Sequence, residues 1–434
     1  MKRDATMEPR RGCFRGVPDV RWISIAAAEA RAVQVGLMRV LFLSTWFPFP
    51  LSQGSKIRAY HLIKAIARNH DSALVSFADT QLDQSWADHM RQFCSQVRLV
   101  ERDPFATSSL GNIRGWFSLH PSFVRSAYSK EMASVVRQFS SQWRPDRIVV
   151  FTFVAGPYAL AVDDVTRVID VDNFMSRMMF EAYQEAIGVN AKARRYLAWR
   201  KFLHYEKWLY HRFDRCLAVT SHDRALMGSQ LGLDPDRICV IPNGVDTVYN
   251  RPTDDPPDRY TLVFNGSLMY DANYDAMMYF LREVFPAIYD RCPCIKLTIT
   301  GKHDGVPVDR LPHAERVKFT GYLDDIRPVV RRSWACIAPI RMGGGTRLKI
   351  LEAMALGTPV VSTSKGAEGL GAIPGEHLLV ADDPREFAEK TISLLDDLQL
   401  RQSLSIHASK FVQDRYEWKM IGERFESIVG RSRF

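Results

Sequence analysis

Apolar residues along this chain form short continuous runs that alternate with stretches of helical spacing. The first run, residues 39–45 (RVLFLST), has the character of a strand buried in a parallel sheet. A loop with prolines and a glycine follows over 46–56, then apolar residues at helical spacing over 57–70, then a second strand-like run over 72–79. This succession predicts the opening unit of an α/β domain.

The same alternation continues in two blocks separated by the Pro- and Asp-rich segment 253–258 (TDDPPD), which is typical of a linker. In the first block a long helical stretch is predicted over 177–213. Further strands are predicted at 147–153, 166–172, 215–221, 237–246, 260–267, 295–301, 316–321, 335–340 and 359–363. Two such blocks predict two doubly wound Rossmann-like domains, with ligands bound at the carboxyl ends of the strands.

We therefore expect an N-terminal domain over 38–252 and a C-terminal domain over 259–414. A final helix within 415–434 is expected to pack back towards the N-terminal domain. Residues 1–37 resemble a signal peptide, with a basic start and an A-x-A-like end, but their apolar patch is short and interrupted by charges. We interpret them as a disordered leader or an overlong start, because the first core strand opens after Met38.

Composition limits the partners. The 434 residues carry a net charge of +9, which suits anionic partners such as nucleotides or lipid head groups, but a solvated basic surface explains it equally well. No run approaches the roughly 18 apolar residues of a membrane span, and no nucleic-acid-binding motif occurs. Seven scattered cysteines fit a reduced compartment. We expect a cytoplasmic protein, with peripheral contact to an anionic membrane left open.

The most informative segment is 339–363, PIRMGGGTRLKILEAMALGTPVVST. It predicts a strand, a glycine loop and a helix over 346–356 that ends at Gly357. Glycines let a ligand approach the backbone, and free amides at a helix N-terminus bind anions. Arg347 and Lys349 place positive charge where the helix dipole disfavours it, a penalty that a bound diphosphate would reverse.

Glu352 lies further along the same predicted helix. Its carboxylate could accept hydrogen bonds from the two hydroxyls of a ribose. Alternatively, Lys349 and Glu352 form an ordinary surface ion pair at i, i+3. Spacing alone does not separate these interpretations, although the glycine run favours a ligand.

From Arg39 onward, the chain resembles the family 4 glycosyltransferases, a large retaining group with the GT-B fold. The resemblance rests on a series of motifs in order along nearly the whole chain: PFPLSQGSKIR, VIDVDN, CLAVTSHD, VIPNGVD, VFNGSL, TITGK, VKFTGYLDD and GGGTRLKILEAMALGTPVVSTSKGAEGL. The last motif is similar to members linked to bacterial exopolysaccharide and envelope glycan synthesis. A GT-B fold has two Rossmann-like domains facing a central cleft.

The resemblance implies a nucleotide-sugar donor held by the C-terminal domain and a glycan or lipid-linked acceptor held by the N-terminal one. Glu352 matches the second glutamate of the family's E-x7-E motif, which contacts the ribose, but the first is replaced by Gly344. Sugar contacts must then come from elsewhere, for example from the amides of Gly343 to Gly345. The cations that the family often places after the first strand of the second domain are absent here, so Arg347 and Lys349 take the diphosphate role.

Other residues are assigned by the same resemblance. Gly266 and Thr346 are expected on the donor side. Glu368 is expected either to reach the donor nucleotide or to complete a turn. Asp172, at a position where many members carry histidine, is expected near the reacting sugar.

The loop after the first strand supplies a third group of candidates. Gly54 is expected to approach the diphosphate or the acceptor, unless it is a plain turn glycine. Lys56 and Arg58 could steer an anionic acceptor or face solvent. The lone histidines His61 and His120 are expected to be structural.

The sequence predicts a metal-independent reaction without a cofactor. No His/Cys/Asp/Glu cluster has metal-ligand spacing, and we interpret the DVD triplet at 170–172 as a strand end. The leading hypothesis is a retaining glycosyltransferase whose leaving diphosphate is stabilised electrostatically. The alternatives are a nucleotide-sugar epimerase or hydrolase on the same scaffold, and a non-catalytic partner in a polysaccharide assembly complex.

Overall fold

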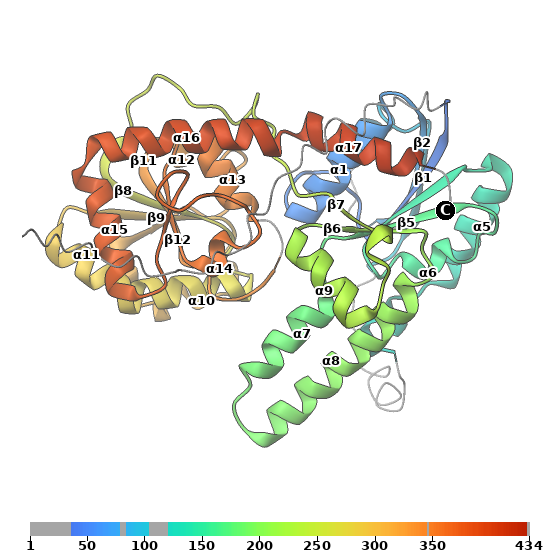
Figure 1. Ribbon diagram of the computed structural model, residues 1–434, viewed down its shortest axis with the longest axis horizontal. Coiled ribbons are helices and arrows are strands. Elements are labelled where there is room, and N and C mark those ends of the chain that lie inside the picture. The colour runs from blue at the N-terminus through green and yellow to red at the C-terminus, as the bar shows by residue number, and fades with distance from the viewer. Residues whose placement is uncertain (1–35, 79–83, 104–119, 345–346, 432–434) are drawn as a thin grey trace, which may run out of the picture. The chain divides into compact units, whose positions relative to one another are not determined.

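A computed structural model describes residues 36–78, 84–103, 120–344 and 347–431. Residues 37–434 form one compact unit, which contains two Rossmann-like domains (Figure 1). The predicted fold class, two Rossmann-like α/β domains, is confirmed. Residues 1–35 of the predicted leader lie outside the described residues, so its role stays a prediction.

The N-terminal domain has a seven-stranded, all-parallel sheet in the order β3-β2-β1-β4-β5-β6-β7. Its strands are β1 Arg39–Ser44, β2 Asp71–Ala78, β3 Gln96–Glu101, β4 Arg147–Phe151, β5 Thr166–Val171, β6 Arg215–Ala218 and β7 Ile238–Val240. Its helices are α1 Gly54–Ile66, α2 Gln84–Met90, α4 Ser122–Ala127, α5 Lys130–Trp143, α6 Gly156–Ala159, α7 Met175–Gln184, α8 Val189–Tyr210 and α9 Ser221–Leu231. The strand order reverses between β1 and β4, which places a ligand crevice at their carboxyl ends.

The C-terminal domain has a six-stranded parallel sheet in the order β10-β9-β8-β11-β12-β13. Its strands are β8 Asp258–Asn265, β9 Lys296–Thr300, β10 Val317–Phe319, β11 Ser333–Ala338, β12 Val360–Ser362 and β13 Leu379–Val380. Its helices are α10 Asp271–Tyr279, α11 Phe285–Arg291, α12 Arg327–Arg332, α13 Leu348–Ala355, α14 Ser364–Ala367, α15 Pro384–Asp396 and α16 Leu398–Tyr416.

Both sheets are buried on two faces, which is why their central strands read as continuous apolar runs. In β1, Leu41 and Leu43 pack into the core on one face, and Val40 and Phe42 into the core on the other. The sequence did not predict β3 and β13, because β3 is an edge strand in which apolar and polar residues alternate only weakly and β13 has only two residues. No helix in the described ranges is long and apolar enough to span a membrane.

Two helical regions bear on the predictions made from the sequence. The predicted helix over 177–213 is two helices: α7 ends at Gln184, and α8 begins after Gly188, its N-cap residue. The φ of +87° at Gly188 is incompatible with a continuous helix through this position. The last helix, α17 (Trp418–Gly430), packs on α1 and contributes Phe425 to the N-terminal core (Figure 1). A Cβ on Gly422 would lie 2.6 Å from Ala65 Cβ, so glycine is needed for this close contact.

Candidate active site

A cavity of about 1460 Å³ opens between the two domains at the carboxyl ends of both sheets. The N-terminal wall includes Gly54 at the start of α1 and Asp172 just after β5. The C-terminal wall includes Gly266 after β8, and Lys349 and Glu352 on α13. Segments predicted separately to carry ligand-binding residues therefore meet at one cavity.

Arg347 is held by the glycine loop. The helix α13 begins at Leu348, two residues later than predicted, with Arg347 at its N-cap position. The side chain folds back and donates from Nη2 to the carbonyl oxygens of Gly343 at 2.6 Å and Met342 at 3.3 Å. The Nε–H is buried without a hydrogen-bond partner among the described residues. Burial lowers the pKa of Arg347, and an anion in the cavity would offset that desolvation.

The other residues of the predicted glycine loop differ in their position relative to the cavity. Gly344 lines the cavity, whereas Gly343 is buried behind it with a φ of +87°. Gly345 and Thr346 lie outside the described residues.

Lys349 points under the loop that follows β8. Its Nζ donates to Asn273 Oδ1 at 2.6 Å and lies 4.1 Å from the ring centroid of Phe264. A Cβ on Gly266 would lie 2.7 Å from this Nζ, so glycine is needed for the lysine to reach its place. Burial, with Arg347 nearby, lowers the pKa of Lys349 to about 7.

Glu352 is half-buried on the same wall. Burial raises its pKa to about 7, and the charge of Lys349 opposes this shift. The alternative of a surface ion pair between Lys349 and Glu352 is wrong: neither is exposed, and the ion pairs of the described residues do not include one between them. Two half-buried ionisable groups with pKa values near neutrality, on one helix and lining one cavity, are characteristic of a functional site.

The N-terminal wall is partly as predicted. Asp172 lines the cavity and accepts a hydrogen bond from Ser55 Oγ. Gly54 lies where the two domains meet, since a Cβ there would be 3.1 Å from Leu348 Cδ1. Lys56 is half-buried in the first turn of α1.

The assignment of Arg58 to the acceptor site is wrong. Its side chain is fully buried and donates to both carboxylate oxygens of Asp170, at 2.7 and 2.8 Å. Its Nη1 donates to Pro242 O and Asn243 Oδ1 at 3.0 and 3.1 Å. Arg58 therefore fixes the end of β5 and the turn between the domains. Asp170, an acid inside an apolar strand, was the sequence signal for such a partner.

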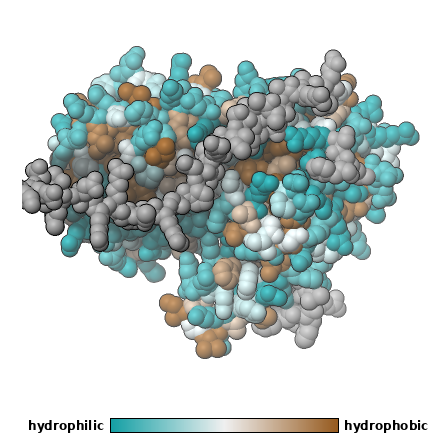
Figure 2. Space-filling view, viewed as in Figure 1, coloured by the Kyte–Doolittle hydropathy of each residue, from teal (hydrophilic) through white to brown (hydrophobic). Residues whose placement is uncertain are grey.

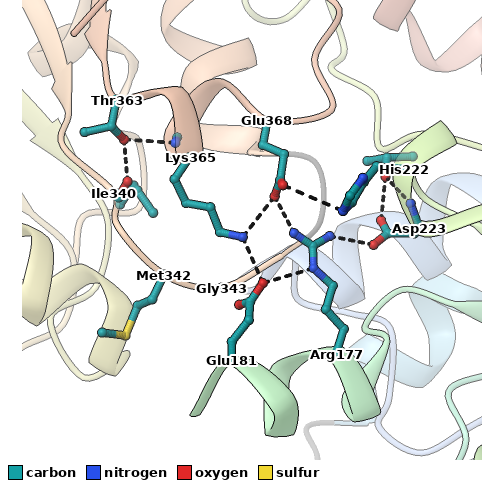
Figure 3. Close-up of polar contacts among 12 residues, drawn as sticks. Arg177, Glu181, His222, Asp223, Ile340, Met342, Gly343, Thr363, Lys365 and Glu368 are labelled. Atoms are coloured by element: carbon teal, nitrogen blue, oxygen red, sulfur yellow. Dashed lines mark hydrogen bonds and ion pairs between the residues drawn. The ribbon is translucent and has the colours of Figure 1, made fainter. Parts of the chain in front are cut away.

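The assignment of Glu368 to donor binding is also not supported. Its carboxylate accepts from Arg177 Nη2 at 2.5 Å and pairs with Lys365 at 3.1 Å (Figure 3). Arg177, from α7, also pairs with Glu181 at 3.1 Å and Asp223 at 2.8 Å. This cluster joins the two domains, and Glu368 is not among the residues that line the cavity.

Sequence reasoning missed several residues that line or border the cavity. Asn273 and Tyr270 precede or begin α10, Lys302 follows β9, and Arg177 borders Gly344. Lys302 could have been found, because it is the one cation in the TITGK motif. His61 also lines the cavity, stacked on Trp418 at 4.7 Å between ring centroids, and burial lowers its pKa to about 4. No group of three or more potential metal ligands occurs in the described ranges.

Two facing Rossmann-like domains around such a cleft are the arrangement of the GT-B glycosyltransferases. Two family models match, "Glycosyltransferase Family 4" over residues 52–249 and "Glycosyl transferases group 1" over residues 259–397. The chain belongs to the group 1 glycosyltransferases, as its motifs predicted.

Similar proteins cover nearly the whole chain. An uncharacterized 44.6 kDa protein from the cps region of Klebsiella pneumoniae is 21% identical, over 90% of this chain and 99% of its own. The sucrose-phosphate synthase of Thermosynechococcus elongatus has a TM-score of 0.69 at 15% identity, over 90% of this chain and 98% of its own. The Anabaena protein HepE, solved with UDP and glucose, has a TM-score of 0.63 at 15% identity, over 90% and 99%. These structures confirm the fold.

Proposed function

We propose that this glycosyltransferase moves a sugar from a nucleotide-sugar donor to a glycan or lipid-linked acceptor, with retention of anomeric configuration, in bacterial polysaccharide synthesis. The observation that carries the donor assignment is the C-terminal wall. There Gly344, Arg347, Lys349 and Glu352 line one cavity, and the buried Nε–H of Arg347 has no hydrogen-bond partner among the described residues. Two comparisons support the proposal. HepE, which has a similar fold, was solved with UDP and glucose. The Klebsiella relative comes from a cps region.

On this proposal, Glu352 accepts hydrogen bonds from the ribose hydroxyls, and Lys349 binds the diphosphate. Negative charge grows on the diphosphate as the sugar leaves. Arg347 and Lys349 therefore stabilise the transition state more than the bound donor. The acceptor hydroxyl attacks from the face that the diphosphate leaves, and Asp172 orients the acceptor or a sugar hydroxyl. Neither a metal nor a cofactor is part of this proposal.

The acceptor wall differs in character from the donor wall. Its lining includes Leu51, Phe123, Met175 and Met178, which favour a partly apolar acceptor such as a lipid-linked sugar. A glycan acceptor would instead use the polar groups around Asp172.

The first experiment incubates the protein with a panel of nucleotide sugars and a bacterial membrane-lipid extract, with and without EDTA, and identifies products by mass spectrometry. Glycosylated products that persist in EDTA support the proposal, and NMR of the new linkage tests retention. Free sugar or an epimerised donor as the sole product would support a hydrolase or epimerase. Donor binding without any product would support a non-catalytic partner.

Two variants test the site. Glu352→Gln keeps the side-chain size but removes the charge that binds the diol, so donor affinity should fall about ten- to a hundred-fold, as for a lost charged hydrogen bond. Arg347→Ala should lower kcat more than donor affinity. Exposed positions on α15 give matched controls, Glu389→Gln and Arg385→Ala. Parent-like donor titrations and single-turnover rates in both site variants would contradict the assignment.

A further inference from the structure

The hairpin of α7 and α8 carries an exposed apolar surface outside the active site. The two helices lie side by side and extend away from the N-terminal sheet (Figure 1). At the connection, Ile187 is 93% exposed and Val189 is 85% exposed. Side chains of this kind are normally scattered singly on a surface, but here they are adjacent. Figure 2 shows apolar side chains at this far end of the hairpin.

The apolar surface continues along one face of α8. Val189, Ala193 and Leu197 follow each other at i, i+4 and i+8, and Tyr196 lies beside them. Leu197 and Tyr196 are 48% and 42% exposed. The opposite face of α8 packs on α7, where Trp199 lies against Phe180 at 4.8 Å between ring centroids. Tyr196, at the border of the stripe, contacts Tyr183 of α7 at 5.6 Å between ring centroids. The ring contacts between α7 and α8 therefore involve Tyr196 and Trp199, and the exposed stripe is formed by Val189, Ala193 and Leu197.

Cations flank this stripe. Lys192 and Arg194 lie on its two sides, and Arg200 lies at its inner end. All three are exposed, and the ion pairs of the described residues involve none of them. Between 186 and 203 the chain has no acidic residue. An apolar stripe bordered by cations fits an anionic lipid surface, where apolar side chains enter the interface and cations meet phosphates.

The same hairpin also reaches the active site. At its inner end, Met175 and Met178 of α7 line the acceptor wall of the cavity. The ten residues of α7 place the connection about 15 Å beyond Met175, at about 1.5 Å per residue. A membrane at the hairpin tip would therefore lie within reach of the mouth of the acceptor wall.

We propose that the α7–α8 hairpin docks on an anionic membrane through Ile187, Val189, Leu197, Lys192 and Arg194, and presents a lipid-linked acceptor to the cleft. This inference rests on the proposed function for the identity of the acceptor. The docking itself needs no turnover, so it is tested separately.

The test is cosedimentation of the full chain with vesicles of phosphatidylcholine containing phosphatidylglycerol, beside vesicles of phosphatidylcholine alone. The parent should bind the anionic vesicles, more weakly as salt is raised. The variant Lys192→Gln/Arg194→Gln/Arg200→Gln should bind about a hundred-fold more weakly, at roughly five-fold per cation. The variant Ile187→Ser/Val189→Ser should lose at least about ten-fold.

A matched control removes three exposed cations of the C-terminal domain, as Lys296→Gln/Arg310→Gln/Lys318→Gln. This control should bind anionic vesicles like the parent. If it instead loses as much binding as the hairpin variant without the three cations, net charge and not the hairpin accounts for the binding, and the proposal is overturned. Equal binding of the parent to both vesicle types would also overturn it. A third outcome would overturn it as well. If the parent does not bind vesicles, and sedimentation velocity without lipid shows a parent dimer that the hairpin substitutions dissociate, then the stripe binds a second copy of the chain.

All altered residues are exposed, so the unfolding transitions of the variants should match that of the parent. Turnover with a water-soluble acceptor should also remain at the parent level in the hairpin variants. Absence of turnover in every protein, with vesicle binding intact, would defeat the proposed function and leave the docking surface standing.

Discussion

Binding of a nucleoside diphosphate at pH 8 should be accompanied by uptake of nearly one proton. Lys349 provides the reason. In the empty site its ammonium group is desolvated and close to Arg347, and its pKa is lowered to about 7. A diphosphate beside Nζ favours the charged form, so the pKa of Lys349 should return towards its ordinary value of 10.5. Protons are taken up at any pH between those two values.

The magnitude follows from the two pKa values. With a pKa of about 7, roughly one-tenth of the Lys349 side chains are protonated at pH 8, and nearly all are protonated when the pKa is near 10. The uptake is therefore about 0.9 proton. Glu352 makes a small opposite contribution: its pKa is about 7, so it is already about nine-tenths ionised at pH 8 and releases about 0.1 proton on becoming fully charged. The net uptake should be about 0.8.

Isothermal titration of UDP and GDP at pH 8 in buffers of different ionisation enthalpy measures this number directly. The phosphates of the ligands are fully ionised at this pH and add nothing of their own. Lys349→Met should abolish the uptake, while the remote exposed control Lys296→Met should retain it. A binding heat that is the same in every buffer would refute the reasoning, because Lys349 would then be either charged in the free protein or remote from the diphosphate.

The remaining predictions concern the scaffold of the site. Gly343→Ala should lower the free energy of unfolding by about 1–2 kcal/mol because its φ is +87° and Tyr270 Oη would lie 3.2 Å from the new Cβ. Gly344→Ala, whose nearest neighbour would be at 3.6 Å, should be nearly neutral; equal losses in thermal melts would contradict this distinction. Arg58→Met leaves Asp170 buried without its partner and should cost about 3–5 kcal/mol in denaturant unfolding. A parent-like midpoint would show that the pair is not needed.

The sequence predicted the architecture well because both sheets are parallel and buried on two faces. Such strands, β1 for example, appear as continuous apolar runs bounded by Gly and Pro. It predicted poorly where the local pattern carries little information. The edge strand β3 alternates weakly, and a single glycine, Gly188, divides a pattern that otherwise predicts one long helix.

The common orientation of Lys349 and Glu352 could be predicted from the sequence because one segment carries both residues. Lys349 and Glu352 lie on one helix, so their common direction follows from spacing, and the structure places both at the cavity. Arg58 and Glu368 were misassigned because their partners, Asp170 and Arg177, are more than 100 residues away. A charged side chain near a ligand motif has the same local sequence whether it binds a ligand or another side chain.

Gly344 stands where the family's E-x7-E motif has its first glutamate. The ion-pair cluster around Arg177 offers a physical explanation for this glycine. The Cβ of a residue at Gly344 would lie 3.6 Å from Arg177 Nη1. That guanidinium already donates from Nε to Glu181, from Nη1 to Asp223 and from Nη2 to Glu368. A fourth carboxylate would have to displace one of these or remain unpaired beside them.

Gly344→Glu should therefore destabilise the protein relative to Gly344→Gln, which has the same shape without the charge. We expect a difference of about 1–3 kcal/mol in unfolding free energy at low salt, from added repulsion among carboxylates in a partly buried cluster. Because that repulsion is screened, the difference should shrink as NaCl is raised. If Gly344→Glu instead equals or exceeds Gly344→Gln in stability at low salt, Arg177 has capacity for a fourth carboxylate, and the cluster does not explain the missing glutamate.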